Sequence, residues 1–361
     1  MTTTQFQYQP SPARVVFGRG TLAQLGEEAD RLALKRLLVV STPEQRGHAE
    51  RASSALGDRA AVLFDAAAMH TPVEVTERAL ALALQSGVDG VVAIGGGSAI
   101  GLSKALALRT DLPQIVVPTT YAGSEATPIL GETQDGLKLT QRSEKVLPEV
   151  IVYDVDLTLG LPVAMSIVSG LNAVAHAAEA LYAPDGNPLI SALAEEGATA
   201  LLGALPRIRT EPTDVRARSE ALYGAWLCGA CLGSVGMGLH HKLCHTLGGT
   251  FGLPHAETHA IILPHALAYN LPGAPDARRR LARALGSQDP SSALARLAAS
   301  LGAPLALRDI GMPESGLERA ADLATQNAYA NPRPVDRDEI LLLLKRAWAG
   351  EPPPATAPLD E

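Results

Sequence analysis

The sequence predicts an N-terminal α/β domain with a doubly wound parallel sheet, followed by an all-α C-terminal domain. The chain has 361 residues, more than one ordinary domain requires. Within residues 1–156, short apolar runs alternate with amphipathic stretches, as they do in βαβ units. Residues 157–350 instead carry Ala- and Leu-rich segments of helical periodicity, and the Pro-rich, acidic stretch 351–361 predicts a flexible tail.

Four apolar runs predict buried parallel strands, because none of them alternates with polar residues. These runs cover residues 37–40, 61–64, 91–94 and 115–117. The amphipathic stretch 73–85 follows Thr71-Pro72 and predicts a crossover helix. In the second half the predicted helices cover residues 166–182, 189–205, 215–232, 237–249, 277–286 and 291–301.

The composition excludes several classes of protein. A formal net charge of -8 argues against nucleic acid or an anionic membrane as a partner. The three cysteines are an odd count with no disulfide framework, and the Cys228-x-x-Cys231 pair lies in a small, apolar run that predicts buried helix thiols. We find no signal peptide and no apolar run of membrane-spanning length, which predicts a soluble, cytoplasmic protein.

A glycine-rich loop, Gly95-Gly96-Gly97-Ser98, follows the buried strand 91–94 and precedes a predicted helix over 99–108. Glycines let the backbone approach a phosphate, and a helix N-terminus supplies free N–H groups. A tight turn without a ligand is the alternative, because the spacing is not G-x-G-x-x-G. The next strand end, 117–125, is also polar, and two polar strand ends together predict the walls of a Rossmann-like dinucleotide crevice.

Seven of the nine histidines fall between residues 176 and 265. His241 and His245 are four residues apart and so share one helix face, and Asn172 and His176 repeat that spacing on an earlier helix. His255 follows Pro254 in a predicted loop. A single histidine is more often a core or surface residue, but this clustering favours a polar pocket between helices. A zinc-protease motif is excluded, because Lys242 occupies the position of the catalytic glutamate.

In these residues the chain resembles the iron-containing alcohol dehydrogenase family, from Phe17-Gly18-Arg19-Gly20 to Tyr269-Asn270. The motifs that carry the resemblance are Gly95-Gly96-Gly97-Ser98, Asp156-Leu157, Gly170-Leu171-Asn172-Ala173 with His176 and Glu179, His241-x-x-x-His245, Pro254-His255 and Leu263-Pro264-His265. The resemblance implies a dehydroquinate synthase-like fold, NADH or NADPH as cofactor, and a homodimer.

The chain departs from the family pattern at its metal site. The family binds its metal through an Asp and three His, and the matching positions here are Asn172, His176, His241 and His255. Because the only anionic ligand is missing, we expect these positions to be vestigial and no catalytic metal to be bound, although three histidines can hold zinc. Gly101 stands where the family has Asp, and the segment 119–125 is one residue shorter than usual.

These departures resemble a branch of the family that reduces the carbon–carbon double bond of maleylacetate to 3-oxoadipate in bacterial degradation of aromatic compounds. This implies a small dicarboxylate substrate. The predicted catalytic residues are His176, His241, His245 and His255. The predicted substrate-binding residues are Asn172, Tyr121, Ser124, Lys242 and His240. The predicted cofactor-binding residues are Gly95, Gly96, Gly97, Ser98, Ser41, Thr119, Thr120 and Leu157.

Other functions stay open from the sequence. Ser41-Thr42-Pro43-Glu44 places no acidic residue directly after the strand 37–40, so either NADH or NADPH is plausible. A metal-dependent alcohol or polyol dehydrogenase of the same fold is the nearest alternative, and its activity would be lost to a chelator. A lyase such as dehydroquinate synthase would turn over without net NADH consumption. A non-enzymatic module would bind NADH without turnover.

Overall fold

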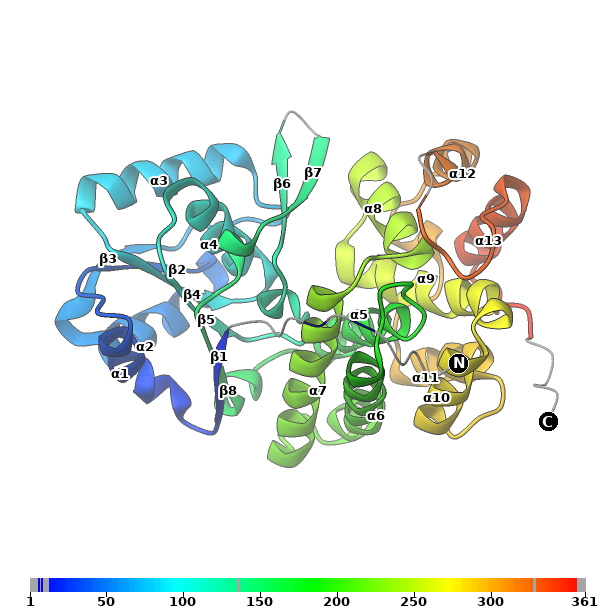
Figure 1. Ribbon diagram of the computed structural model, residues 1–361, viewed down its shortest axis with the longest axis horizontal. Helices are drawn as coiled ribbons and strands as arrows, with labels where there is room; N and C mark the ends of the chain where they lie inside the picture. Colours follow the sequence, from blue (N-terminus) through cyan, green and yellow to red (C-terminus); the bar gives the residue numbers. More distant parts are fainter. Residues whose placement is uncertain (1–5, 7, 9–12, 135–136, 327–328, 356–361) are drawn as a thin grey trace. The chain divides into compact units, whose positions relative to one another are not determined.

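The computed structural model describes residues 6, 8, 13–134, 137–326 and 329–355 of the chain, which form two compact units (Figure 1). The described residues of the α/β unit lie within 10–161 and 213–222. Most described residues of the helical unit lie within 162–212 and 223–361. The last six residues of the predicted tail, 356–361, lie outside the described part.

The α/β unit is built on a six-stranded parallel sheet with the order β1-β8-β5-β4-β2-β3. The strands are β1 (Arg14–Gly18), β2 (Leu37–Val40), β3 (Ala60–Phe64), β4 (Gly90–Gly95), β5 (Gln114–Pro118) and β8 (Val150–Asp154). The four inner strands are buried along their whole length, whereas the edge strands β1 and β3 are partly exposed. The four strands predicted from apolar runs are confirmed, and β1 and β8 join them.

Helices cover both faces of this sheet (Figure 1). They are α1 (Leu25–Arg31), α2 (Arg46–Leu56), α3 (Val73–Ser86) and α4 (Gly97–Thr110). Val92 and Ile94 of β4 pack in one core with α1 and α2, while Val91 and Ala93 pack in another with α3 and α4. Successive side chains of a strand point to opposite faces, so one apolar run supplies both cores. A separate antiparallel hairpin consists of β6 (Ile129–Gln134) and β7 (Leu137–Arg142).

The second half of the chain is helical, as predicted. Its helices are α5 (Val163–Ala180), α6 (Pro188–Thr210), α7 (Val215–Ser234), α8 (Leu239–Phe251), α9 (His255–Asn270), α10 (Pro275–Leu285), α11 (Pro290–Leu301), α12 (Leu317–Thr325) and α13 (Arg337–Ala349). The first residues of α7 belong to the α/β unit and the rest to the helical unit. Cys228, Cys231 and Cys244 are free and buried. This confirms the prediction that Cys228 and Cys231 are buried helix thiols.

The prediction for His255 in this half was wrong. His255 does not lie in a loop but is the first residue of α9, after Pro254 as its N-cap. Helix α9 is buried on all sides from Thr258 to Asn270 and contains Pro264. It therefore lacks the one-sided apolar stripe by which a helix is recognised in a sequence.

Helix α6 is long and apolar enough to cross a membrane, contrary to the expectation that no run reaches that length. Nearly half of its apolar window is buried, however, and it packs along α5. Its Glu195 accepts hydrogen bonds from Arg280 at 2.6 Å and from Arg283 at 2.7 Å, both on α10. The packing on α5 and the ion pairs with α10 show that α6 belongs to the helical unit.

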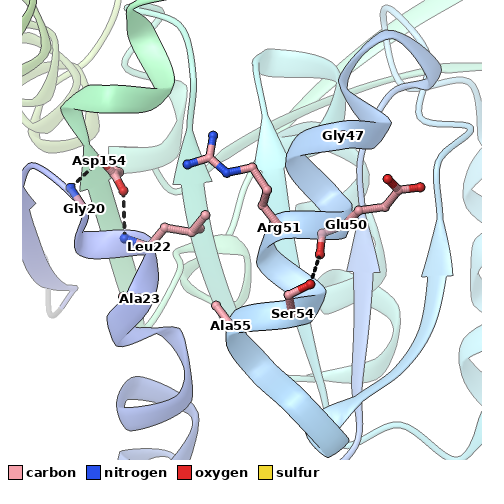
Figure 2. Close-up of a pocket in the computed structure, with 9 residues that line it drawn as sticks. All are labelled: Gly20, Leu22, Ala23, Gly47, Glu50, Arg51, Ser54, Ala55 and Asp154. Atoms are coloured by element: carbon pink, nitrogen blue, oxygen red, sulfur yellow. Dashed lines mark hydrogen bonds between the residues drawn. The ribbon is translucent and has the colours of Figure 1, made fainter.

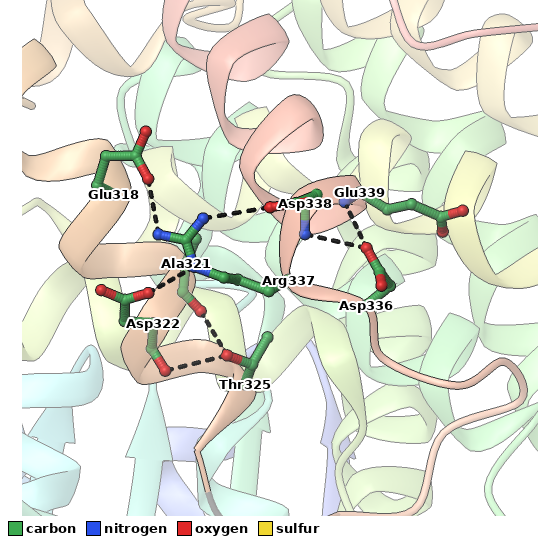
Figure 3. Close-up of polar contacts among 8 residues, drawn as sticks. All are labelled: Glu318, Ala321, Asp322, Thr325, Asp336, Arg337, Asp338 and Glu339. Atoms are coloured by element: carbon green, nitrogen blue, oxygen red, sulfur yellow. Dashed lines mark hydrogen bonds and ion pairs between the residues drawn. The ribbon is translucent and has the colours of Figure 1, made fainter.

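An exposed ion-pair network joins α12 to α13 (Figure 3). Arg337 at the start of α13 donates from Nη2 to Glu318 Oε2 and from Nε to Asp322 Oδ1, each at 2.7 Å. Asp336 caps the same helix by accepting from the backbone N–H groups of Asp338 and Glu339, each at 3.0 Å. The ends of two helices are thus fixed by one guanidinium and one carboxylate.

Candidate active site

The glycine loop of the α/β unit packs closely against neighbouring side chains. Gly95 ends β4 with φ 150°, and a Cβ there would lie 2.6 Å from Gln45 Oε1. A Cβ at Gly96 would lie 2.9 Å from Thr120 Cγ2. A Cβ at either position would force a neighbouring side chain to move, and at Gly95 the positive φ adds backbone strain.

The loop ends in the first turn of α4. Gly97 is exposed and Ser98 is half-buried. Gly96 is the N-cap of α4, and as a glycine it has no side chain that could accept from the first N–H groups of the helix. The first N–H groups of a helix have no partner within it, and its dipole favours an anion there. This turn can therefore bind a phosphate through its backbone.

The structure brings the second polar strand end beside this loop. Thr119 follows β5, and its backbone N–H donates to Gly95 O at 3.0 Å. Gln45 Nε2 donates to Thr119 Oγ1 at 2.7 Å, which connects the segment after β2 to the segment after β5. Sequence reasoning missed Gln45, since no motif marks it. Ser41 directly follows β2, and its buried Oγ has no hydrogen-bond partner among the described residues.

Tyr121, Ser124 and Leu157 lie in the interior of the α/β unit. Tyr121 is fully buried, and Arg218 Nη1 donates to its hydroxyl at 3.1 Å. Leu157 packs in the core on the α1 and α2 side of the sheet. Ser124 has a buried Oγ without a hydrogen-bond partner among the described residues. Of the three, only Ser124 offers an unused polar atom.

A buried lysine holds the backbone around Ser124. Lys104 Nζ donates to Ser124 O and Thr127 O, each at 2.6 Å, and to Ile129 O at 3.0 Å. Burial lowers the pKa of Lys104 to about 7, against the attraction of Glu125. Lys104 of α4 therefore fixes the backbone of the segment after β5.

The histidines of the helical unit come together from three helices. His176 lies on α5, His241 and His245 lie on α8, and His255 lies on α9. The ring centroids of His176 and His241 are 5.2 Å apart and stacked, and those of His241 and His245 are 6.0 Å apart. His255 lies 4.3 Å from His259, which in turn lies 5.1 Å from His241. The clustering predicted from the spacing is thus present within this unit.

Glu179 connects α5 to the start of α8, and no role was predicted for it. Its carboxylate accepts from the backbone N–H of Gly238 at 2.9 Å and of His240 at 2.8 Å. His241 Nδ1 donates to Glu179 Oε2 at 2.6 Å. Burial would raise the pKa of Glu179, but His241 outweighs it and the pKa falls to about 2. The ionised carboxylate fixes the ring of His241 and leaves its Nε2 facing away, buried and unpartnered among the described residues.

His176 and His240 are neutral at pH 7. Burial, reinforced by His241, lowers the pKa of His176 well below its usual value and that of His240 to about 3. His240 Nε2 shares a hydrogen with His259 Nδ1 at 2.9 Å, so His240 faces the interior of the unit. Lys242, on the same helix, is half-buried.

The family's metal positions do not converge here. Asn172 Oδ1, His176 Nδ1 and His241 Nε2 are buried and unpartnered among the described residues, but none of these three atoms belongs to a carboxylate. Across the described chain, the group of ligand atoms that gathers within 4.8 Å belongs to His240, Cys244 and His259, not to His176, His241 and His255. Without a carboxylate ligand or a convergent set, these positions do not fit a catalytic divalent metal.

A separate pocket of about 530 Å³ opens in the α/β unit beside α2 (Figure 2). Asp154 at the end of β8 accepts from the backbone N–H groups of Gly20 and Leu22, each at 2.9 Å. Figure 2 shows Arg51 reaching from α2 into the space that these residues face. None of the predicted site residues lines this pocket, although it lies at the carboxyl ends of β1 and β8.

Comparison with known proteins gives consistent matches over both halves of the chain. Residues 12–155 match the family model for iron-containing alcohol dehydrogenase, and residues 166–348 match the C-terminal model of the same family. Maleylacetate reductase from Sphingobium indicum is 55% identical over 349 residues, 97% of this chain and 99% of that protein. Maleylacetate reductase from Rhizobium sp. (strain MTP-10005) is 56% identical over 348 residues, 96% of this chain and 99% of that protein.

Solved structures agree with this. The crystal structure of the Rhizobium maleylacetate reductase superimposes with a TM-score of 0.93 at 55% identity, covering 97% of this chain and 100% of that one. A 1,3-propanediol oxidoreductase superimposes with a TM-score of 0.89 at 26% identity, covering 95% of this chain and 100% of that one. The fold is shared by both, whereas sequence identity is about twice as high with the reductase.

Proposed function

The chain belongs to the iron-containing alcohol dehydrogenase family, and we propose that within this family it acts as a maleylacetate reductase. It would reduce the carbon–carbon double bond of maleylacetate to give 3-oxoadipate, with NADH or NADPH as the reductant. The observation that carries this proposal is the identity of 52–56% with maleylacetate reductases over nearly the whole chain. Asn172 at the family's carboxylate position supports it, because a reductase of this kind has no alcohol oxygen for a metal to polarise.

The reaction requires hydrogen-bond donors for the enolate oxygen and a general acid for the neighbouring carbon. NADH or NADPH supplies the hydride, which adds to the alkene carbon farther from the ketone. Negative charge then develops on the ketone oxygen of the resulting enolate, where N–H donors stabilise it. A general acid completes the reaction by protonating the neighbouring carbon. None of these steps requires a Lewis acid.

We assign these tasks to the histidine cluster. His241 is held by Glu179 through its Nδ1–H, so its Nε2 is the nitrogen that we assign to the reacting end of the substrate. His176 stacks on His241 and orients it. His245 and His255 complete the set, and one of these four histidines protonates the carbon. The metal that the family model implies has no part in this scheme, and we propose that none is required.

Binding groups are assigned on the same grounds. Asn172 can donate to a carboxylate from its side-chain Nδ2, and Lys242 and His240 lie on the first turns of α8, so we assign these three residues to the two carboxylates of the substrate. In the α/β unit, Ser124 offers a free hydroxyl oxygen and Tyr121 shapes the same segment. Of the five residues assigned to substrate binding, His240 has the weakest support, because its ring is already hydrogen-bonded to His259.

The cofactor is assigned to the α/β unit. The first turn of α4, with Gly95, Gly96, Gly97 and Ser98, suits the pyrophosphate. Ser41, Thr119, Thr120 and Leu157 would line the rest of the crevice. No acidic residue directly follows β2 to repel a 2′-phosphate, so we expect both NADH and NADPH to be used. A ratio of kcat/KM for the two cofactors within about tenfold would agree with this.

The decisive experiment follows NADH absorbance with maleylacetate, using EDTA-treated and untreated enzyme side by side. We expect rapid oxidation that is equal in both samples. NAD⁺ reduction by simple alcohols that needs added metal, together with no turnover of maleylacetate, would instead identify a metal-dependent alcohol dehydrogenase. Turnover without net NADH loss would identify a lyase.

We further propose a homodimer in the cytoplasm, without nucleic acid or membrane as a partner. Three free thiols suit a reducing compartment, and the net charge of -8 suits neither anionic partner. Size-exclusion chromatography with light scattering tests the dimer, since one chain has a mass of 37.6 kDa.

A further inference from the structure

We propose that His240, Cys244 and His259 form a binding site for a single zinc ion, separate from the positions at which the family binds its metal. All three side chains are buried, and their ligand atoms lie within 4.8 Å of one another. Two imidazoles and a thiolate are the donors that zinc and other borderline-soft cations prefer, whereas magnesium and calcium require oxygen.

The distances between the donor atoms match the shape of a zinc site. With bonds of about 2.05 Å to nitrogen and 2.3 Å to sulfur, a tetrahedral centre separates two nitrogens by roughly 3.3 Å and nitrogen from sulfur by roughly 3.6 Å. Here His240 Nε2 lies 2.9 Å from His259 Nδ1 and 3.7 Å from Cys244 Sγ. The donor atoms of His259 and Cys244 lie within the 4.8 Å that encloses all three, so side-chain adjustment would bring the three donors around one ion.

The site uses different faces of the helices that carry the catalytic histidines. His240 and Cys244 are four residues apart on α8, each one position before the corresponding member of the pair His241 and His245. One residue rotates a side chain by about 100° around the helix, so the two pairs point in different directions. His259 lies one turn beyond the start of α9. A metal at this site would join α8 to α9 without occupying the catalytic nitrogens.

The ion displaces the proton of the Cys244 thiol to solvent, so the thiolate offsets one of the two positive charges of zinc. Glu179 lies close to the site, since its carboxylate accepts from the backbone N–H of His240 at 2.8 Å.

Cobalt(II) is the probe, because it takes the place of zinc and its bond to a thiolate gives a charge-transfer band in the near ultraviolet. Metal-free full-length enzyme is titrated with Co²⁺ in the absence of substrate and cofactor, and bound metal is counted by mass spectrometry. We expect one ion per chain, the thiolate band, and displacement of cobalt by one equivalent of zinc. In Cys244→Ser the band disappears and affinity falls at least tenfold, and in His259→Gln affinity also falls.

His255→Ala is the matched control, since it removes a family metal position on the same helix. It keeps both the thiolate band and the stoichiometry if the proposal is right. The proposal is overturned if wild-type enzyme takes up no cobalt, if the bound ion shows no thiolate band, or if His255→Ala abolishes binding. The spectrum of the wild type decides even where Cys244→Ser fails to fold, and no outcome depends on the reductase assay.

Discussion

At the scale of single residues, Glu179 shows how one carboxylate serves two purposes. It holds the first N–H groups of α8 at Gly238 and His240, and it fixes the Nδ1–H tautomer of His241. A buried carboxylate that lost either set of donors would be destabilised by several kcal/mol, so the two roles support each other.

Replacing Glu179 with Gln tests the second role. The neutral amide is a weaker acceptor for the Nδ1–H of His241 and orients the ring less firmly, so we expect kcat with maleylacetate to fall roughly 10²-fold while KM for NADH stays nearly unchanged. Steady-state kinetics checks this, with circular dichroism to show that α8 is retained. Tyr182→Phe is the control, because it removes a 3.4 Å contact to the same carboxylate, and one to Asn270, without changing the contact to His241. Equal kcat in Glu179→Gln and wild type would mean that His241 needs no such partner.

Residue-level prediction from the sequence succeeded where spacing was the signal. The i, i+4 pairs predicted which histidines share a helix face, and the cluster followed from that.

Spacing carries no information on partners from distant segments, and Gly101 illustrates this. A Cβ at Gly101 would overlap Thr71 Oγ1, and Thr71 itself has a φ of 47°, which is unusual for a β-branched residue. The absence of the family's Asp at 101 is therefore explained by a contact across thirty residues of sequence, which only the structure reveals.

At the scale of elements, buried strands were predicted better than buried helices. A parallel strand covered on both faces remains visible as a continuous apolar run, as β2, β4 and β5 show. Helix α9 is equally buried but has no polar face to define its period, and α12 and α13 were not predicted. Strand β1 escaped prediction because it is an edge strand with mixed exposure.

The ion-pair network of Figure 3 allows a test at this scale. Arg337→Ala removes the contacts from α13 to Glu318 and Asp322 on α12, so we expect a small decrease in Tm. The decrease should shrink as salt is added, because exposed charges are screened. Thermal unfolding at low and high ionic strength measures it. Arg216→Ala, which breaks an exposed pair within α7, serves as the control, and an identical loss for both variants would show that the link between helices adds nothing.

For the whole molecule, sequence composition predicted the succession of an α/β half and a helical half. It had no means to predict that residues 213–222 return to the α/β unit, where Arg218 is fully buried and donates to Tyr121 and to Leu161 O. Local periodicity describes a helix but not which core each end of it joins. The boundary at residue 156 stays a prediction.

The buried histidines predict how stability depends on pH. Burial lowers the pKa of His240 to about 3 and that of His265 to about 4, and it lowers those of His176 and His259 well below their usual value. In the unfolded chain these groups titrate near pH 6.5, so below that pH the unfolded state binds protons that the folded state does not. Their stabilising contribution is complete above pH 6.5 and is lost as pH falls toward 3.

Urea unfolding of EDTA-treated protein at pH 7, 6 and 5 measures this loss. Each such histidine removes about 1.4 kcal/mol of unfolding free energy per pH unit within its window, so the midpoint should shift steeply to lower urea. His259→Gln should be less stable at pH 7 but should show a shallower slope. Identical midpoints at pH 7 and pH 5 would contradict the assignment of neutral histidines.

The free cysteines on α7 have a practical consequence. Burial raises the pKa of the Cys228 thiol well above its usual value and that of Cys231 to about 12, so neither supplies a thiolate at neutral pH while the fold is closed. An alkylating reagent will therefore modify them only in molecules that have transiently opened. The rate of alkylation therefore reports how often this helix opens in the native protein, and no added label is needed.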